Sequence, residues 1–248
     1  MATNANRIEV LGTIQNISGA DSEDAVRSMT RSVIRHAGAE HFIFSTLRLD
    51  RSNQPCRACH YFEDCSQQWR SIYDERKWYM NDPLVEYAKS HSEPTLCSNI
   101  VPITRGQADM LKTFALHGFR SGMVVPAHGI LGAHECLGIL LIGSPCEPDQ
   151  TEPLFLANRI SLRALAMELM DWWKNHFRNC AVQKLKLKQL DLTVLEYLRN
   201  GKTVAEISAI MEIRPSTLYH QLAILKDKLR AAQNGDAVVN AKAHGLLG

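Results

Sequence analysis

Apolar residues in the last part of the chain recur every three or four positions, which is the spacing of an amphipathic helix. Leu218, Leu222, Leu225 and Leu229 follow this spacing. Pro215 precedes them, and proline suits the first position of a helix. The pattern therefore predicts a helix that begins near Pro215 and buries its leucines.

A shorter helix is predicted directly before this one. Thr203 and Glu206 have the capping-box spacing, in which each side chain satisfies a free amide at a helix start. Ile207 and Ile210 then share one apolar face, and residues 212–214 form a turn. Two helices in this arrangement fit the major groove of DNA. The side chains expected to contact bases or phosphates are Lys202, Arg214, Ser216, Thr217, Tyr219, His220, Gln221 and Lys226.

The earlier part of the chain mixes segments of helical and strand character. Mixed strands and helices, with helices at the ends, predict an α/β/α sandwich built on an antiparallel sheet. The fold class is thus α+β, with this sandwich followed by an all-α helix-turn-helix domain. We expect a first domain at 1–174, a linker at 175–187 and a second domain at 188–248. The predicted helices are 22–38, 69–78, 83–90, 107–117 and 154–177, and the predicted strands are 41–49, 61–62, 122–125 and 137–142.

Charge adds one local feature to this picture. The net charge of +2 over 248 residues is too small to indicate nucleic-acid binding by itself. Between Asp171 and Asp191, however, the only charged side chains are basic. Such a stretch beside a helix-turn-helix would strengthen phosphate contacts, and a solvated linker face is an equal alternative.

Neither a signal peptide nor a membrane-spanning segment is expected. The first residues are polar, and the longest apolar stretch, 136–146, is too short to span a bilayer. We therefore expect a cytoplasmic protein that does not contact membranes. The seven cysteines are better interpreted as reduced thiols than as a disulfide framework.

The C-terminal region resembles the DNA-binding domain of LuxR-type transcription factors. The resemblance rests on residues 201–207, 213–218, 228–229, 237–238 and 245–247, without a gap. It implies double-stranded DNA as a partner, a palindromic site and a homodimer. An amphipathic helical domain that binds protein is the alternative.

This region departs from the family pattern at three places. Arg214 stands where a capping serine is usual, and Pro215 partly compensates. Gln221 stands where a histidine is frequent, with His220 one position earlier. Residues 187–192 lack the usual acidic pair before the first helix.

The first domain resembles the autoinducer-binding domain of the same family. Trp69, Tyr73, Asp82 and Gly122 occur in the family order, with the family's spacing from the tryptophan to the aspartate. The resemblance implies that the Trp69 indole donates to the lactone carbonyl of an acyl-homoserine lactone. Asp82 would accept from the ligand amide, and Tyr73 would lie along the acyl chain. Alternatively, Trp69 and Tyr73 only pack the core, and Asp82 only caps a helix that begins at Pro83.

Several substitutions make the expected pocket less polar than in the family. Cys65, Leu84 and Leu141 stand where hydroxyl-bearing side chains are frequent, and Cys97 stands near an expected tryptophan. Phe114 is bulky where a small residue is common. The ligand is then an acyl-homoserine lactone, a different amphiphile, or none. The expected ligand-binding residues are Trp69, Tyr73, Asp82, Tyr61, Cys65, Leu84, Phe114, Gly122 and Leu141.

A cysteine-rich run in the first domain has some features of a cofactor site. Cys56, Cys59 and His60 match the pattern of c-type haem attachment, which requires export. With Cys65 they barely supply four zinc ligands, so a loop with incidental thiols is favoured. We expect no metal, cofactor or catalytic residues, because no Ser-His-Asp or paired-carboxylate motif is present.

Together these patterns predict a ligand-responsive transcriptional regulator that binds palindromic promoter DNA as a homodimer. Ala237, Val238 and Ala241 offer one dimer face, and the helix at 154–177 offers another. RNA polymerase would be a further partner of an activator. The alternatives are an orphan or ligand-independent regulator and a lactone-processing enzyme fused to a DNA-binding domain.

Overall fold

The computed structural model describes residues 4–49 and 60–247 of the chain. The predicted turn at 51–55 and the two cysteines Cys56 and Cys59 lie outside the described residues. The chain divides into two compact units. The first contains Met1–Gly129 and Glu135–Trp173, and the second contains Ile130–His134 and Lys174–Gly248.

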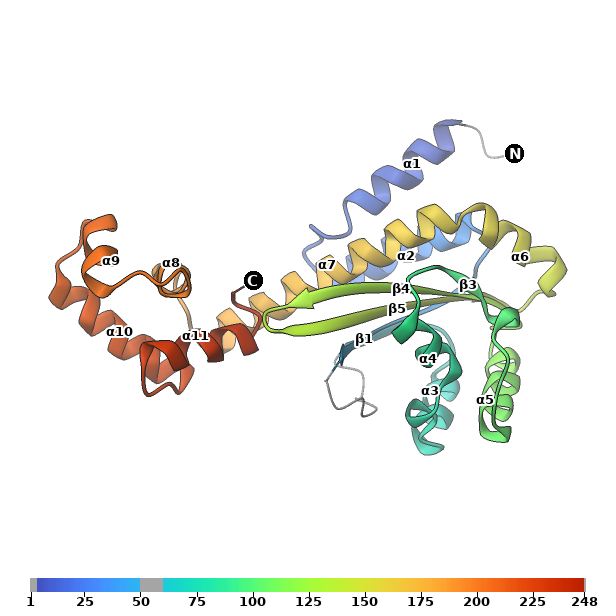
Figure 1. Cartoon of the computed structure of the whole chain (residues 1–248). Coiled ribbons are helices and arrows are strands. Elements are labelled where there is room, and N and C mark those ends of the chain that lie inside the picture. The colour runs from blue at the N-terminus through green and yellow to red at the C-terminus, as the bar shows by residue number, and fades with distance from the viewer. Residues whose placement is uncertain (1–3, 50–59, 248) are drawn as a thin grey trace. The chain divides into compact units, whose positions relative to one another are not determined.

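The first unit is built on a five-stranded sheet with the order β2-β1-β5-β4-β3 (Figure 1). Strand β1 lies between β2 and the central strand β5 and pairs antiparallel with both, so that Ile43 lies opposite Glu63 on one side and Leu141 on the other. The predicted antiparallel sheet is confirmed. The strands are β1 (His41–Leu49), β2 (His60–Asp64), β3 (Thr95–Leu96), β4 (Ser121–Leu131) and β5 (His134–Ser144).

Helices cover both faces of this sheet, which confirms the α/β/α sandwich (Figure 1). One layer contains α2 (Glu23–His36), α6 (Pro148–Ala157) and α7 (Arg159–Lys184), preceded by α1 (Asn4–Gln15). The opposite layer contains α3 (Gln67–Glu75), η1 (Trp78–Met80), α4 (Pro83–Ser90), η2 (Cys97–Asn99) and α5 (Arg105–Leu116).

Successive residues of a strand point to opposite faces, and β1 divides its side chains between the two layers accordingly. Phe44 packs against Phe62, which contacts Trp172 of α7. Ile43 and Leu47 belong instead to the buried cluster beneath α3, α4 and α5. The second face therefore carries the candidate ligand-binding residues.

Several boundaries differ from the prediction. The expected helix at 154–177 is two helices that meet at Asn158, whose side chain and backbone N–H both bond to the Leu154 carbonyl. Local side-chain bonds of this kind compete with helix continuation. Helix α7 runs on to Lys184, so most of the expected linker is helical. Helix α1 and strand β3 were not predicted, and β4 and β5 are longer than expected.

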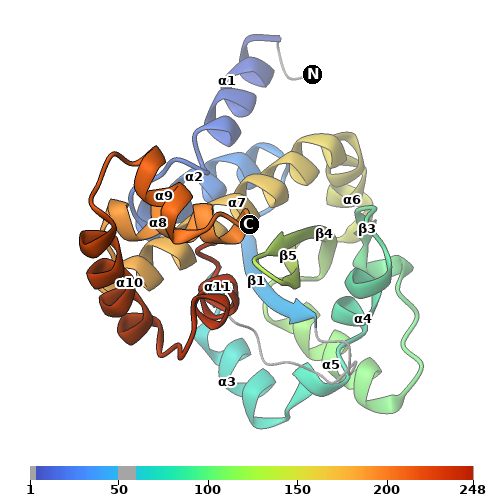
Figure 2. The ribbon, with the colours of Figure 1, turned by 60° about the vertical axis from the view of Figure 1, so that its left-hand side comes forward.

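The second unit contains α8 (Gln189–Arg199), α9 (Val204–Ile210), α10 (Pro215–Leu229) and α11 (Asn234–Ala243) (Figure 2). The four leucines predicted to share one face of α10 are all buried. They form a core with Val194, Leu195 and Ile207 from α8 and α9. Among the described residues, no helix is both long and apolar enough to cross a membrane.

Candidate functional site

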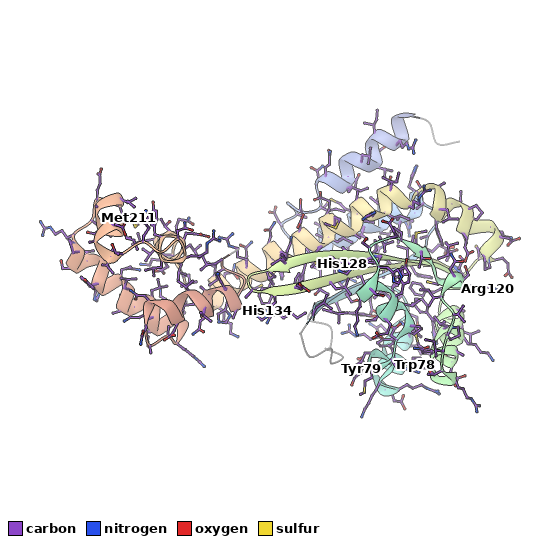
Figure 3. All side chains as sticks on the ribbon, viewed as in Figure 1. Trp78, Tyr79, Arg120, His128, His134 and Met211 are labelled. Carbon is purple, nitrogen blue, oxygen red and sulfur yellow. The ribbon has the colours of Figure 1, made fainter. Side chains whose placement is uncertain are left out.

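Trp69 on α3 is the centre of an aromatic group in the first unit. It is 3% exposed, and its ring lies 4.8 Å from Phe114 of α5 and 5.5 Å from Tyr73, one turn further along α3. Trp78 stacks on it at 5.7 Å and lies with α3 and α5 on one side of the sheet (Figure 3). Trp78 was not among the expected site residues, because its position follows from the short helix η1 and not from the periodicity of α3.

Asp82 is a buried carboxylate at the start of α4. Its Oδ1 accepts hydrogen bonds from the backbone N–H groups of Leu84 at 2.8 Å and Val85 at 3.4 Å. Its Oδ2 accepts from the Tyr73 hydroxyl at 2.7 Å. Asp82 therefore caps the helix, which was the structural alternative, and also pairs with a predicted pocket residue.

Burial raises the pKa of Asp82, although the bonds from Tyr73 and from the two backbone amides oppose that rise. Burial also raises the pKa of Tyr73, and the neighbouring Asp82 raises it further. The phenol thus stays a donor to the carboxylate. The pair places a strong hydrogen-bond acceptor inside an otherwise apolar cluster, where polar groups need partners.

The structure brings the remaining expected ligand residues to the same face of the sheet. Cys97 packs against the cluster. A Cβ added at Gly122 would lie 3.1 Å from the Cys97 Sγ and 3.1 Å from the Ile142 carbonyl oxygen, so a larger residue there would require these neighbours to shift. One buried cluster contains, in its core or packed against it, Trp69, Leu84, Phe114, Leu141, Tyr61, Cys65 and Tyr73.

A second carboxylate on this face was missed by the sequence analysis. Glu63 accepts from the Cys65 thiol at 3.4 Å, and Arg70 Nη1 lies 3.6 Å from its other oxygen. The Arg70 guanidinium also lies over the Tyr61 ring at 4.5 Å. Burial raises the pKa of Tyr61 and of Cys65, with Glu63 adding to both shifts. The alternation of β2, which sets Tyr61 and Glu63 on one face, was the available signal.

The expectation of no metal site rests on sequence alone for part of the cysteine-rich run. Cys56 and Cys59 lie outside the described residues. Within the described part of the chain, no three His, Cys, Asp or Glu side chains are grouped so as to hold a metal ion.

The helix-turn-helix of the second unit forms as predicted. The Glu206 N–H bonds to Thr203 Oγ1 at 3.3 Å, and Thr203 N–H bonds to Glu206 Oε2 at 2.7 Å. In the turn, Glu212 adopts a left-handed conformation with φ of 54°. The Ser208 hydroxyl donates to the Ile213 carbonyl and ties the end of α9 to the turn.

The first turns of α10 present a polar surface. Ser216, Thr217, Tyr219 and His220 are exposed, with Tyr219 at 62%. Arg214 and Lys202 are also exposed, and Lys226 is half-buried. Lys202 also forms a 3.8 Å ion pair with Glu206.

Gln221 differs from its neighbours because its side chain is turned inward. It is half-buried, and its amide Nε2 donates to Asp191 Oδ1 of α8. Lys228 Nζ reaches the other oxygen of Asp191 at 2.8 Å and also donates to the Lys186 carbonyl at 2.8 Å.

Asp191 is therefore the centre of a buried polar network that sequence reasoning did not find. It is 0% exposed and also accepts from the Lys188 N–H at 2.8 Å. Burial acts to raise its pKa, but the bonds from Lys188, Lys228 and Gln221 outweigh burial and lower the pKa. Asp191 lies three residues after the N-cap residue Lys188, a position from which a carboxylate can accept the N-cap N–H.

The expected dimer face on α11 is corrected by the structure. Ala237 and Ala241 are buried in the core of their own unit, with Val238 packed against that core. The outward-facing apolar residue of this helix is Val239, which is 65% exposed. Helix α11 needs its small residues to pack closely on the other helices, so that face is not available to a second copy.

Comparisons with known proteins agree with this division. The family model described as "Autoinducer binding domain" matches residues 22–171. A model described as "Bacterial regulatory protein, arsR family" matches residues 192–228, which include α9 and most of α10. The transcriptional activator protein AhyR of Aeromonas hydrophila is 21% identical over 203 residues, covering 75% of this chain and 72% of its own length.

Two solved structures show the same fold at low sequence identity. CepR2 of Burkholderia cenocepacia, described as an N-acylhomoserine lactone dependent LuxR family factor, has a TM-score of 0.57 at 14% identity. The match covers 68% of this chain and 98% of CepR2. SdiA, an Escherichia coli protein, in complex with octanoyl-rac-glycerol has a TM-score of 0.57 at 13% identity, covering 100% of this chain and 99% of SdiA.

A sandwich domain with a buried polar pair in an apolar cluster, followed in one chain by a helix-turn-helix, defines a ligand-responsive transcriptional regulator. Such regulators couple small-molecule binding to a change in DNA affinity. The chain belongs to the LuxR-type quorum-sensing regulators with an autoinducer-binding domain.

Proposed function

We propose that this regulator senses an acyl-homoserine lactone or a related amphiphile and binds palindromic promoter DNA as a homodimer. The observation that carries the proposal is the Tyr73–Asp82 pair. The Tyr73 hydroxyl lies 2.7 Å from Asp82 Oδ2, and the pair holds the Asp82 carboxylate, a hydrogen-bond acceptor, beside the apolar cluster. Sites for small amphiphiles combine mostly apolar walls with a few placed polar groups. The domain that contains the pair is the one matched by the autoinducer-binding family.

The polar groups suit the head of such a ligand. Asp82 would accept from the ligand amide, and the Trp69 indole would donate to a lactone or ester carbonyl. Apolar and aromatic side chains such as Leu84, Phe114 and Leu141 would surround the chain. CepR2 is described as dependent on an acyl-homoserine lactone, and SdiA forms a complex with an acylglycerol, so both ligand classes are candidates.

Ligand binding would change DNA affinity through linkage, because a ligand that binds one state stabilises that state. A homodimer would place two α10 helices one turn of DNA apart, as a palindromic site requires. Leu154, Ile160 and Met167 are exposed apolar residues on α6 and α7 and are proposed as the dimer surface. As an activator the protein would also contact RNA polymerase, and we propose that it acts in the cytoplasm.

Small molecules extracted from the purified full-length protein and identified by mass spectrometry test the ligand directly. We expect an amphiphile with an amide or ester head, and a rise in melting temperature when N-octanoyl-homoserine lactone is added. Footprinting on promoter DNA should then show two protected half-sites. Absence of any bound or stabilising amphiphile would contradict the sensing role, and a single half-site occupied at saturation would contradict the dimer.

A ligand-independent regulator is the second candidate, and one observation favours it. Phe114 stacks on Phe119 at 4.0 Å and contacts Trp69 at 4.8 Å, so large side chains of the protein occupy this face. In that case the purified protein would bind its DNA equally well with and without amphiphile. A lactone-processing activity would instead appear as loss of added lactone over time.

A further inference from the structure

The Glu63 carboxylate on β2 is not used in the function proposed above, although Tyr61 on the same face of β2 is an expected ligand-binding residue. Glu63 lies opposite Ile43 of β1, so its side chain faces the cluster that contains Trp69, and not the layer of α2 and α7. Neighbouring Asp64 points the other way and pairs with Arg31 of α2. The Glu63 side chain is only 13% exposed.

The groups that contact the Glu63 carboxylate are donors. Arg70 Nη1 lies 3.6 Å from Oε1, and the Cys65 thiol lies 3.4 Å from Oε2. The Tyr61 phenol lies close enough for Glu63 to raise its pKa further, after burial. A carboxylate has about four lone-pair sites. The Arg70 contact is long for a charge-assisted hydrogen bond, and a thiol is a weak donor. Glu63 therefore retains capacity to accept a further, stronger hydrogen bond.

Tyr61 and Glu63 also lie near the Tyr73–Asp82 pair. Tyr61, Cys65, Trp69 and Tyr73 all belong to or pack on one cluster. Tyr61 is close enough to Tyr73 to add, after burial and Asp82, to the rise of the Tyr73 pKa. One side of the sheet thus carries the hydrogen-bonded Tyr73–Asp82 pair and, on β2, Tyr61 with the neighbouring Glu63 carboxylate.

We propose that Glu63 is a specificity-determining residue, which accepts a hydrogen bond from a hydroxyl on the acyl chain while Asp82 holds the head group. This inference rests on the proposed sensing function. The preferred ligand is then a hydroxyacyl amphiphile and not an oxoacyl one. A keto oxygen is itself an acceptor, so it cannot form a hydrogen bond with the Glu63 carboxylate and would be repelled by it. Arg70, the charged donor beside Glu63, already faces that carboxylate and lies over the Tyr61 ring, and neither Cys65 nor Leu141 offers an oxo group a strong donor in compensation.

The test measures binding of three probes to the full-length chain by titration and thermal shift. The probes are the N-octanoyl, N-(3-oxooctanoyl) and N-(3-hydroxyoctanoyl) homoserine lactones. The wild-type chain should bind the hydroxy probe at least about tenfold more tightly than the oxo probe, as expected for a charge-assisted hydrogen bond. This ranking needs no variant, so it is informative even if a substitution prevents folding.

Two variants assign the preference to the carboxylate. Glu63→Gln keeps the shape but adds an amide donor, so the hydroxy preference should fall to within about threefold of the oxo probe. Tyr61→Phe removes the phenol and leaves the carboxylate, so the preference should persist. Glu75→Gln, the same change at an exposed glutamate that ends α3, is the matched control and should keep the wild-type ranking.

The outcomes separate this inference from the function on which it rests. If none of the probes stabilises the wild-type chain, the proposed function fails and this inference with it. If the probes bind but the hydroxy probe is not preferred, or Glu63→Gln keeps the preference, or Tyr61→Phe abolishes it, the sensing function stands and the role of Glu63 is overturned.

Discussion

Lys228 near the end of α10 extends its ammonium group to within 2.8 Å of the Asp191 carboxylate of α8. The contact joins the helix expected to enter DNA to the helix that supports it. Asp191 is fully buried, and it also accepts from Gln221 on the same face of α10. The orientation of α10 thus depends on one buried carboxylate as well as on the leucine core.

Replacing Asp191 should therefore destabilise the second unit. Asp191→Asn leaves the buried end of Lys228 without its counter-charge, and breaking such a pair destabilises by about 3 kcal/mol. Thermal unfolding of the full-length protein measures the effect. Asp227→Asn, at an exposed aspartate beside Lys228, is the control and should leave the melting temperature unchanged.

The stability that Asp191 contributes should also depend on pH. The pKa of Asp191 is lowered in the folded chain below its ordinary value of about 3.9. Its contribution to stability is therefore complete above that value and is lost as pH falls through the folded pKa. The stability difference between wild type and Asp191→Asn should be constant near neutral pH and should shrink below about pH 4. A difference that grows with acidity would contradict this assignment.

Gln221 and Tyr219 should differ in how they affect DNA binding. Gln221→Ala removes a bond to Asp191, so it should lower stability and weaken binding to all DNA sequences alike. Tyr219→Ala changes an exposed side chain, so it should leave the stability of the protein unchanged. It should reduce the discrimination between bases at the position that Tyr219 contacts by about 1–3 kcal/mol. Binding to a set of single-base variants of the target site measures both. If Gln221→Ala alters base preference, its amide reads DNA directly.

Lys202 and Lys226 are predicted to contact phosphates. Lys202→Ala or Lys226→Ala should weaken binding to all DNA and reduce the slope of log affinity against log salt by about one for each lysine. Affinity measured over a series of salt concentrations gives this slope. Lys112→Ala, on α5 of the first unit, should leave it unchanged. An unchanged slope for both lysine variants would rule out the phosphate contacts.

Asp82 is predicted to bind the ligand head as well as to cap α4. Asp82→Asn replaces a charged acceptor with a weaker one and adds an unneeded donor, so ligand response should fall more than about tenfold. Trp69→Phe should reduce the response less, because it keeps the ring and loses only the indole donor. Dose–response curves and ligand-induced shifts in melting temperature measure both effects.

Tyr73→Phe separates the two roles of Asp82. It removes the 2.7 Å bond to Oδ2 and leaves the capping bonds to Oδ1 intact. The ligand-free protein should lose about 1–3 kcal/mol of stability, because a buried acceptor loses its donor. Added ligand should partly restore that loss. If Asp82→Asn lowers the melting temperature but leaves the ligand-induced shift intact, Asp82 acts only as a helix cap.

Ile160 is predicted to lie in the dimer interface. It is 76% exposed on α7, where an apolar side chain gains from contact with a second copy. Ile160→Glu should produce monomers at concentrations where the wild-type protein is dimeric, as measured by analytical ultracentrifugation. Val239→Glu makes the same change at an exposed apolar residue of α11 and tests for an interface on the second unit. A dimer that survives both substitutions would place the interface elsewhere.

Much of the fold was encoded locally. The leucine spacing of α10 predicted its buried face, because every third or fourth side chain of a helix shares one side. The capping box at Thr203 and Glu206 was visible because its two residues lie within one turn. The order and spacing of Trp69, Tyr73 and Asp82 indicated the candidate site through the family resemblance, and the Tyr73–Asp82 bond that the structure shows joins residues nine positions apart.

What the sequence by itself determined is thus most of the helices and strands, the buried face of α10 and the family to which the motifs belong. Only the tertiary structure decided that Asp191 meets Lys228, 37 positions away, and that Ala237 and Ala241 are used inside their own unit. It also decided that the face of β2 with Tyr61 and Glu63 packs toward the cluster that contains Trp69. The physical reason is range: periodicity and capping act within a turn or a strand, whereas a buried charge pair exists only after separate elements pack together.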